Sequence, residues 1–212
     1  MKTAIILGAT GLTGGHVLNQ LLDHPNYDKI KIFTRKATGV SHPKVEEYLV
    51  DLLNLSAVKS DFTGDEVYVC IGTTKKKTAD LERYKDIDYG IPVAAAKLCK
   101  ENNIPVIAVV SAIGADPESS MFYSRFKGEM ERDVKAQRVE RTYILRPSFI
   151  GGDRQETRIG ERIGLFIFKL INPLMIGGLK KYAIVDSSKI AAKMIALANT
   201  NQSSVTIESD KI

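Results

Sequence analysis

The sequence predicts an α/β fold in which a doubly wound parallel sheet carries helices on both faces. Short apolar runs rich in β-branched residues alternate along the chain with longer segments of helical periodicity, which is the order expected of a parallel sheet. The chain has 212 residues, of which 44% are hydrophobic, so it is long enough for one well-buried core and short for two. We therefore expect one domain over residues 1–212.

A glycine-rich turn joins the first strand to the first helix. The apolar run 4–7 predicts a buried strand, and apolar residues at helical spacing from Val17 to Leu22 predict an amphipathic helix. Three glycines lie between them at GxxGxxG spacing. In such turns the first glycine allows a tight bend, the second lets a ligand approach the main chain, and the third lets the helix pack closely on the strand.

The free N–H groups and the positive dipole end of this helix suit a pyrophosphate. The alternative is a glycine-rich turn that merely joins a strand to a helix. The residues expected to line the dinucleotide here are Gly8, Thr10, Gly11, Leu12, Thr13 and Gly14.

The second strand, predicted over 29–34, ends at Arg35 and Lys36. In dinucleotide-binding folds, a carboxylate at this position accepts the ribose 2′-OH of NAD, whereas a guanidinium accommodates the 2′-phosphate of NADP. Because two bases and no acid stand here, we expect NADP(H) rather than NAD(H), with Arg35 as the main phosphate partner. The alternative is a solvated strand end.

The third and fourth strands are predicted over 45–50 and 65–71. Asp51 follows the third strand, where its carboxylate could accept a hydrogen bond from the adenine amino group and Leu52 could line the ring. A simple turn-forming aspartate is the alternative. The fourth strand ends in Ile71, Gly72 and Thr73, which leave room for the cofactor backbone.

A mainly helical segment over 80–103, with a break at Gly90 and Pro92, leads to a fifth strand over 104–110 that delivers Ser111 at its carboxyl end. The next predicted helix extends to about residue 138 and carries Tyr123 and Lys127, which are four residues apart and share a face. An ammonium one turn from a phenol would stabilise the phenolate, so that the phenol could exchange a proton near neutral pH. Ser111 could polarise a substrate carbonyl.

The glycine turn, the strand-end Ser111 and the Tyr123-x-x-x-Lys127 pair, in this order, resemble a short-chain dehydrogenase/reductase. The resemblance implies a Rossmann-type fold with Ser111, Tyr123 and Lys127 as catalytic residues that also bind cofactor. Segments 70–74, 123–129 and 145–156 are similar to the atypical NADP(H)-binding members grouped with the Tat-interacting-protein-like oxidoreductases, which are related to the NAD(P)-binding NmrA-like proteins. The alternative is an amphipathic helix with a chance YxxxK.

The chain departs from this superfamily at one position of its proton relay. Many members carry Asn-Ala-Gly after the fourth strand and a catalytic Asn on the next helix, whereas this chain has Gly72-Thr73-Thr74 and an Asp86-Ile87-Asp88 segment. A water-relay role for an asparagine is therefore unsupported. How the proton is resupplied stays open.

A sixth strand over 142–145 precedes the segment that the resemblance places beside the nicotinamide, with Pro147 and Ser148 as lining residues. Residues 147–185 are expected to form most of a small substrate pocket, and core packing is the alternative reading of their apolar side chains. A segment over 182–185, a helix over 187–198 and a possible last strand over 205–207 complete the domain.

Composition excludes several other classes of protein. The net charge of +5 is modest and spread along the chain, so nucleic-acid binding is not required. The apolar run 163–178 is interrupted by polar residues and falls short of the roughly 20 residues of a membrane-spanning helix. Cys70 and Cys99 lack metal-ligand spacing, and the amino terminus lacks a leader with a cleavage site, so we expect a reduced, cytoplasmic protein without a metal.

Two functions follow as hypotheses. The first is an NADP(H)-dependent oxidoreductase that transfers hydride between nicotinamide and a small carbonyl or alcohol substrate. The second is an NADP(H)-sensing regulator that binds a protein partner without significant catalysis. The complete Ser/Tyr/Lys set favours the enzyme, because a sensor does not need a phenol that transfers protons. The sequence identifies neither the substrate nor the oligomeric state.

Overall fold

The computed structural model describes residues 1–74, 77–151 and 181–212. A seven-stranded sheet in the order β3-β2-β1-β4-β5-β6-β9 forms its centre, and every neighbouring pair in it is parallel. The strands of this sheet are β1 (Lys2–Leu7), β2 (Tyr27–Thr34), β3 (Val45–Leu49), β4 (Glu66–Val69), β5 (Val106–Val110), β6 (Arg141–Arg146) and β9 (Val205–Glu208). The predicted doubly wound α/β domain is confirmed.

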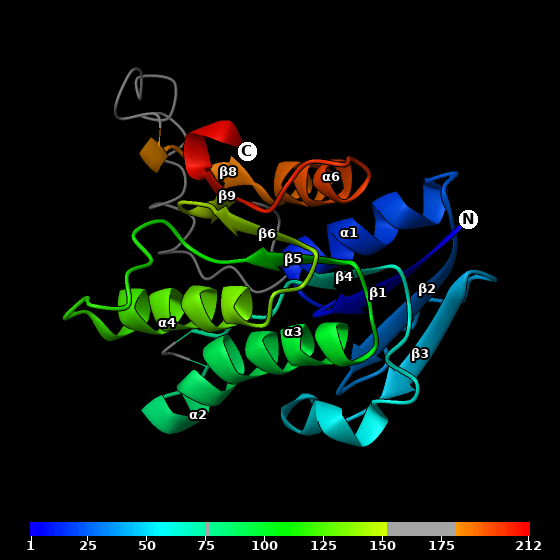
Figure 1. Cartoon of the computed structure of the whole chain (residues 1–212), viewed down its shortest axis with the longest axis horizontal. Coiled ribbons are helices and arrows are strands. Elements are labelled where there is room, and N and C mark those ends of the chain that lie inside the picture. The colour runs from blue at the N-terminus through cyan, green and yellow to red at the C-terminus, as the bar shows by residue number, and fades with distance from the viewer. Residues whose placement is uncertain (75–76, 152–180) are drawn as a thin grey trace.

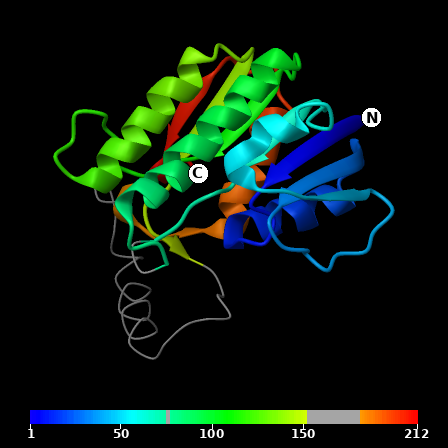
Figure 2. The ribbon, with the colours of Figure 1, turned by 90° about the horizontal axis from the view of Figure 1, so that it is seen from below.

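Helices cover both faces of the sheet (Figure 1). One face carries α1 (Leu12–Asp23) and α6 (Ser187–Ala198), which pack on each other. The other carries α3 (Ile91–Glu101) and α4 (Phe122–Ala136), which run side by side in Figure 2. Each layer has its own fully buried apolar cluster, one including Val17 and Met194 and the other including Leu98 and Met130.

The continuous burial of short apolar runs explains why these segments form central strands. All residues of β4 and β5 are buried, as expected of central strands covered on both faces. Because the strands are parallel, their carboxyl ends meet at one edge of the sheet, which we name the carboxyl edge. The predicted site residues follow β1, β2, β3, β4, β5 and β6 and therefore gather at this edge.

The predicted break at Gly90 and Pro92 is wrong. The helix continues from α2 (Leu81–Lys85) through a π-helical turn, η2 (Asp86–Gly90), into α3. Ile91 N–H donates to the Asp86 carbonyl, which is one residue more than an α-helix spans. Pro92 lies in the first turn of α3, where its missing N–H costs little.

The remaining elements agree with the sequence within a few residues. A 3₁₀ helix, η1 (Leu52–Val58), follows β3, and α6 has the predicted bounds. The predicted segment 182–185 is reduced to β8 (Val185–Asp186), which pairs with β7 (Ile150–Gly151) in a small second sheet. A final 3₁₀ turn, η5 (Ser209–Lys211), follows β9. Most of the predicted pocket region lies outside the described residues.

Candidate active site at the carboxyl edge

The turn after β1 has the geometry that its glycines predict. Gly8 has a φ of +92°, which side chains rarely adopt, and a Cβ at Gly14 would lie 2.1 Å from the Gly8 carbonyl oxygen. Gly11 N–H donates to that same oxygen at 2.9 Å and precedes the first residue of α1. No side chain caps α1 and its first turn has no acid, so this turn fits an anion such as a diphosphate.

The structure leaves the predicted phosphate-reading bases in solvent. Arg35 and Lys36 are exposed just after β2, whereas the Thr34 hydroxyl is buried and donates to the Lys36 carbonyl at 2.8 Å. Asp51 accepts a hydrogen bond from Leu53 N–H at 3.1 Å and thereby caps η1, as the turn-forming alternative expects. Leu52 is buried and borders a cavity of about 250 Å³ between η1 and the η2–α3 helix.

The loop after β4 is tied to the neighbouring helix through its main chain. Thr73 N–H donates to Asp88 Oδ2 at 2.8 Å, and the Tyr84 hydroxyl donates to the Thr73 carbonyl at 3.2 Å. Ile71 and Gly72 precede this anchor, and Gly72 is exposed. The segment expected to pass the cofactor backbone is thus held from the side of α2 and η2.

Lys127 is buried and paired with the same aspartate. Its Nζ lies 3.0 Å from Asp88 Oδ1, and both side chains are almost fully buried, at 4% and 2% exposed. Burial alone would lower the pKa of the Lys127 ammonium, but Asp88, with Tyr123 and Glu131, more than offsets that effect, and the pKa is raised. Lys127 therefore holds a fixed positive charge near neutral pH.

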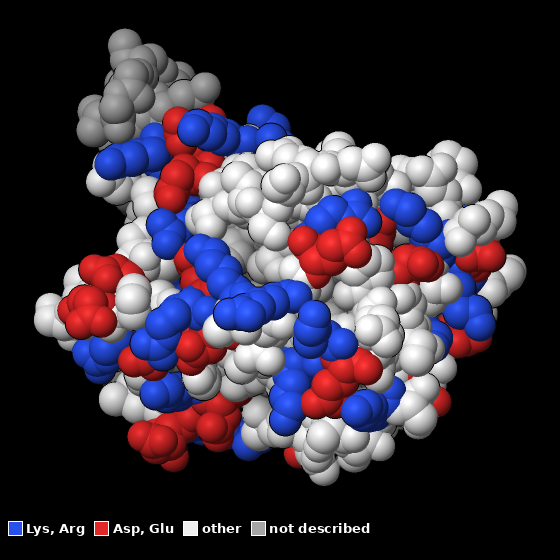
Figure 3. Space-filling model, viewed as in Figure 1, with Lys and Arg blue, Asp and Glu red and all other residues white. Residues whose placement is uncertain are grey.

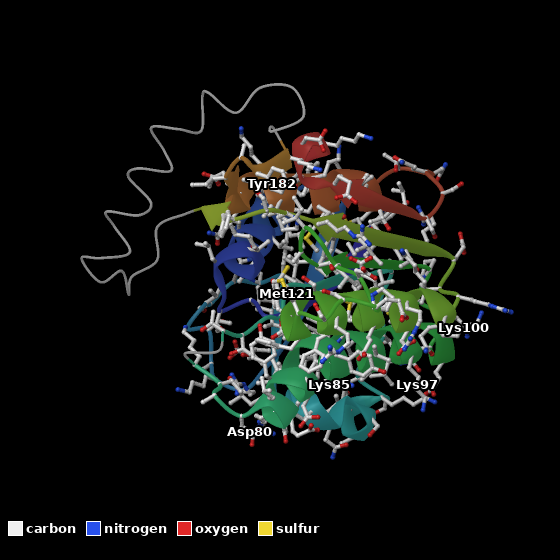
Figure 4. The ribbon with its side chains drawn as sticks, turned by 90° about the vertical axis from the view of Figure 1, so that its left-hand side faces the viewer. Asp80, Lys85, Lys97, Lys100, Met121 and Tyr182 are labelled. Atoms are coloured by element: carbon white, nitrogen blue, oxygen red, sulfur yellow. The ribbon has the colours of Figure 1, made fainter. Side chains whose placement is uncertain are left out.

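Tyr123 lies one turn before Lys127 on α4 and is 37% exposed. Figure 4 labels Asp80 and Met121, which precede α2 and α4, at one end of these helices, and Lys100, near the end of α3, at the other. The first turns of both helices thus lie toward the carboxyl edge. The phenol of Tyr123 is accessible there beside a buried ammonium, and this arrangement can move a proton.

Ser111 is buried at the end of β5, and its hydroxyl donates to Glu131 Oε1 at 2.6 Å. Arg146 binds the same carboxylate with two hydrogen bonds, at 2.9 and 2.7 Å, and also reaches Glu208 Oε1 at 3.0 Å. The hydrogen bonds with Glu131 raise the pKa of Arg146. Since an ionised carboxylate only accepts hydrogen bonds, Ser111 presents its oxygen lone pairs, and not its proton, to the site.

Ser111, Tyr123 and Lys127, which we call the triad, are surrounded by loops whose main chain packs closely against α4 and against neighbouring strand ends. A Cβ at Gly128, on α4, would lie 2.1 Å from Pro117 N, and Asp116 N–H donates to the Ser124 carbonyl at 3.0 Å. After β6, the Pro147 carbonyl accepts from Ile113 N–H at 2.9 Å. Ser148 donates its hydroxyl to the Ala183 carbonyl. The strand ends of β5 and β6 are therefore fixed against each other and against α4.

A family comparison agrees with this geometry. The sequence profile of a family described as NAD(P)H-binding matches residues 8–163 of the chain. The chain belongs to this family. The match begins at the first glycine of the turn and includes Ser111, Tyr123 and Lys127. This membership makes the chain an NAD(P)H-binding protein.

Relatives of this NAD(P)H-binding chain include two fungal proteins. It is 31% identical over 221 residues to protein fmp52-1, mitochondrial, of Aspergillus terreus, covering 99% of this chain and 90% of that protein. It is 32% identical over 219 residues, with the same coverage, to protein fmp52, mitochondrial, of Aspergillus clavatus. Our expectation of a cytoplasmic protein is overturned by these relatives, which are named as mitochondrial.

The fold is shared with a larger enzyme. WbmH of Bordetella bronchiseptica, whose crystal structure is a complex with NAD⁺, superposes with a TM-score of 0.73 at 16% identity, covering 98% of this chain and 76% of WbmH. At this identity the likeness establishes the fold of the family member and nothing more.

Sequence reasoning did not assign three charged residues of this site, namely Asp88, Glu131 and Arg146. Glu131 had a signal, because Tyr123, Lys127 and Glu131 repeat every four residues and thus share one face of α4. Asp88 had none, since an aspartate in a helical segment is normally solvated, whereas here it is buried. Over the described part of the chain, no three His, Cys, Asp or Glu side chains are grouped to hold a metal ion. No described helix is long and apolar enough to cross a bilayer.

Proposed function

We propose that this chain is an NADP(H)-dependent oxidoreductase of the atypical short-chain dehydrogenase/reductase type, akin to the Tat-interacting-protein-like oxidoreductases, acting on a small carbonyl or alcohol. One observation carries the proposal: an accessible phenol, Tyr123, stands one helical turn from the buried ammonium of Lys127 at the carboxyl edge of an NAD(P)H-binding fold. A chain that only binds a dinucleotide has no need of this pair.

Each residue of the site has a role in this proposal. The glycine turn from Gly8 to Gly14 would hold the diphosphate, and Lys127 would hold the nicotinamide ribose. The nicotinamide, when bound, supplies or accepts the hydride. Tyr123 exchanges the proton with the substrate oxygen, and the positive charge of Lys127 stabilises its phenolate. Ser111 would orient a substrate carbonyl oxygen by donating its hydroxyl proton, which requires this hydroxyl to turn from Glu131, its acceptor in the structure, to the substrate.

The preference for NADP(H) rests on Arg35 and Lys36. Both are exposed just after β2, where they are free to meet a 2′-phosphate, and no acid stands beside them in the sequence to accept a ribose hydroxyl. Asp51 and Leu52 would flank the adenine, and Ile71, Gly72, Thr73, Pro147 and Ser148 would line the path toward the nicotinamide. WbmH, which shares this fold, was crystallised with NAD⁺. The affinities of this chain for NADPH and NADH should therefore be compared directly.

The substrate side of the site is proposed to be apolar. Met121, Phe149 and Tyr182 are large apolar or aromatic side chains that stay 64%, 61% and 45% exposed. Met121 precedes the Tyr123 helix, and the other two lie near the two ends of the region 147–185 that we assign to the substrate pocket. Exposed apolar groups beside a proton-transferring phenol favour a hydrophobic aldehyde, ketone or quinone over a charged substrate.

The test is turnover. The purified protein is mixed with NADPH and a panel of aldehydes, ketones and quinones, and oxidation of NADPH is followed at 340 nm, the usual absorbance of the reduced ring. We expect turnover with at least one apolar carbonyl and its loss, by a factor of about 10² or more, in Tyr123→Phe. Tight NADPH binding without turnover on any carbonyl would contradict the proposal.

One observation favours the second candidate, an NADP(H)-sensing regulator. Two members of the triad are engaged by protein carboxylates, Ser111 by Glu131 and Lys127 by Asp88, so both could be retained for packing. In a sensor, Tyr123→Phe keeps cofactor affinity and the effect on its protein partner. In an enzyme the same variant keeps cofactor affinity and loses turnover. Measurement of both properties on one variant therefore separates the two functions.

A further inference from the structure

The Asp88 carboxylate connects two parts of the site with its two oxygens. Oδ1 lies 3.0 Å from Lys127 Nζ, and Oδ2 accepts the Thr73 N–H at 2.8 Å. The side chain is 2% exposed, so water competes little with either contact. A single buried group thus joins the lysine of α4 to the loop after β4.

Asp88 lies in the π turn η2 and shares the inward face of the helix with Tyr84, four residues before it, while Asp86 stays exposed. Tyr84, one turn earlier, is buried and donates its hydroxyl to the Thr73 carbonyl. The helix therefore binds both the N–H and the carbonyl of Thr73. Asp88 provides the charged one of these two contacts, and Tyr84 the neutral one.

The charges around Lys127 and Tyr123 come from a few described residues. Asp88 faces Lys127 from η2, while Tyr123 and Glu131 lie one turn before and one turn after it on α4. Glu131 is held by the two hydrogen bonds of Arg146, so its charge is largely offset. Tyr84 is near both Asp88 and Tyr123. Asp88 is therefore the carboxylate that most reduces the electrostatic effect of the Lys127 ammonium on the Tyr123 phenol.

We infer that Asp88 is a positioning residue that orients Lys127, fixes the Thr73 loop against it, and sets the proton affinity of Tyr123. The inference rests on the proposed proton exchange at Tyr123. A lone buried ammonium would stabilise the Tyr123 phenolate strongly, whereas the neutral Asp88–Lys127 pair does so weakly. Asp88 thereby reduces the positive charge that Lys127 presents to Tyr123, which suits a phenol that donates a proton during carbonyl reduction.

The test compares Asp88→Asn with a matched control, Asp133→Asn. Asparagine keeps an oxygen for the Thr73 N–H and removes the charge. Asp133 on α4 also bonds a residue of η2, accepting from the Tyr89 hydroxyl at 2.8 Å, so its variant likewise removes a charge and keeps an acceptor oxygen at a contact between the same two helices. The readouts are the titration of Tyr123 by NMR with ring-labelled tyrosine, assigned with Tyr123→Phe, the pH profile of kcat/KM, and NADPH affinity.

In Asp88→Asn we expect the Tyr123 titration to move down by about one pH unit, since a negative charge near the phenolate is gone. The loss of carbonyl reduction at high pH should begin about one unit earlier, and NADPH affinity should fall because Lys127 has lost the ion pair that orients it. Asp133→Asn should match the wild type in all three. In Asp88→Asn/Lys127→Met, which removes both charges, the Tyr123 titration should return to or rise above the wild-type value.

The inference is overturned when Asp88→Asn leaves the Tyr123 titration and NADPH affinity at their wild-type values, or when Asp133→Asn shifts them equally. The titration separates it from the proposed function. If the wild type oxidises no NADPH with any carbonyl but Asp88→Asn still moves the Tyr123 titration, the oxidoreductase fails and the electrostatic role of Asp88 stands.

Discussion

At the scale of single residues, two predicted triad members, Ser111 and Lys127, are each bound by a buried carboxylate that the sequence did not assign to the site. The type and order of the triad could be predicted because strand ends and helix faces follow from local pattern. Their partners could not, because Glu131 and Asp88 lie 20 and 39 residues away in the chain. Such contacts depend on how the helices are rotated about their axes, which periodicity does not fix to within one side chain.

Arg35 is the residue on which cofactor choice depends, and Arg35→Ala tests it. The variant is expected to weaken NADPH binding by about 1.5–3 kcal/mol, the usual contribution of a hydrogen bond to a charged group, and to leave NADH binding nearly unchanged. Calorimetry with both cofactors measures this difference. Lys100→Ala, an exposed base near the end of α3, is the control. Equal losses for the two cofactors would show that Arg35 does not read the phosphate.

At the scale of elements, the boundaries that sequence predicts well belong to strands and helices with clean periodicity. The helix over 187–198 is predicted to the residue, because Asp186 caps it by accepting from Ser188 N–H and Asn199 follows its last turn. The helix from α2 to α3 is not, because Gly90 and Pro92 are common at helix ends. In the structure both lie within one continuous helix, Gly90 as the last residue of the π turn η2 and Pro92 just after it.

Two helical glycines on this face have opposite expected responses to alanine. At Gly90 the backbone is helical and a Cβ would meet nothing within 4 Å, so Gly90→Ala should stabilise the fold by up to about 1 kcal/mol. At Gly128 a Cβ would lie 2.1 Å from Pro117 N and 2.2 Å from the Asp116 carbonyl carbon, so the loop must move. Gly128→Ala should therefore cost roughly 1–3 kcal/mol or more.

Urea denaturation of the two variants measures these changes. Gly128→Ala should in addition reduce turnover, because the loop that it displaces follows Ser111, whereas Gly90→Ala serves as its control for the added methyl group. A Gly128→Ala protein as stable as the wild type would mean that α4 and this loop are not packed at main-chain distance.

At the scale of the whole molecule, the sheet has two edges with different chemistry. The carboxyl edge holds the glycine turn and the triad. At the opposite edge, Glu66 is buried at the start of β4 and accepts hydrogen bonds from Tyr27, Tyr68 and Lys2, at 2.5, 2.6 and 2.6 Å. Asn199, after α6, also donates to the Tyr27 hydroxyl, at 2.5 Å. This cluster ties three strands and the last long helix together away from the site.

Charged groups on the outer surface contribute little to the stability of the fold. Figure 3 shows acidic and basic side chains intermixed over the face viewed there, without one sign covering it. Acidic residues of α3 and α4 form ion pairs with nearby lysines. Lys59 lies 2.7 Å from Glu101, and Lys85 lies 3.1 Å from Glu129. Exposed pairs of this kind contribute about 0–1 kcal/mol each. Stability that depends on ionisation should therefore come mainly from buried groups, among them the cluster around Glu66.

The Glu66 cluster predicts how stability changes at alkaline pH. Burial and the bond to Glu66 raise the pKa of Tyr27, and burial with the Glu66 charge raises that of Tyr68. The unfolded chain releases these phenol protons above about pH 10, whereas the folded protein keeps them. Their stabilisation is therefore fully present below pH 10 and is lost as pH rises toward the folded pKa, by about 1.4 kcal/mol per pH unit for each phenol.

Tyr27→Phe removes one of these phenols and its hydrogen bonds. At pH 8 the variant should be less stable than the wild type by about 1.5–3 kcal/mol, because a bond to a buried carboxylate is lost. Above pH 10 that deficit should shrink by about 1.4 kcal/mol per unit, since the variant has one proton fewer to release on unfolding. Urea denaturation from pH 8 to 11 measures both quantities, with Tyr182→Phe, at an exposed position, as the control. A deficit that stays constant with pH would show that Tyr27 ionises as readily in the folded protein as in the unfolded chain.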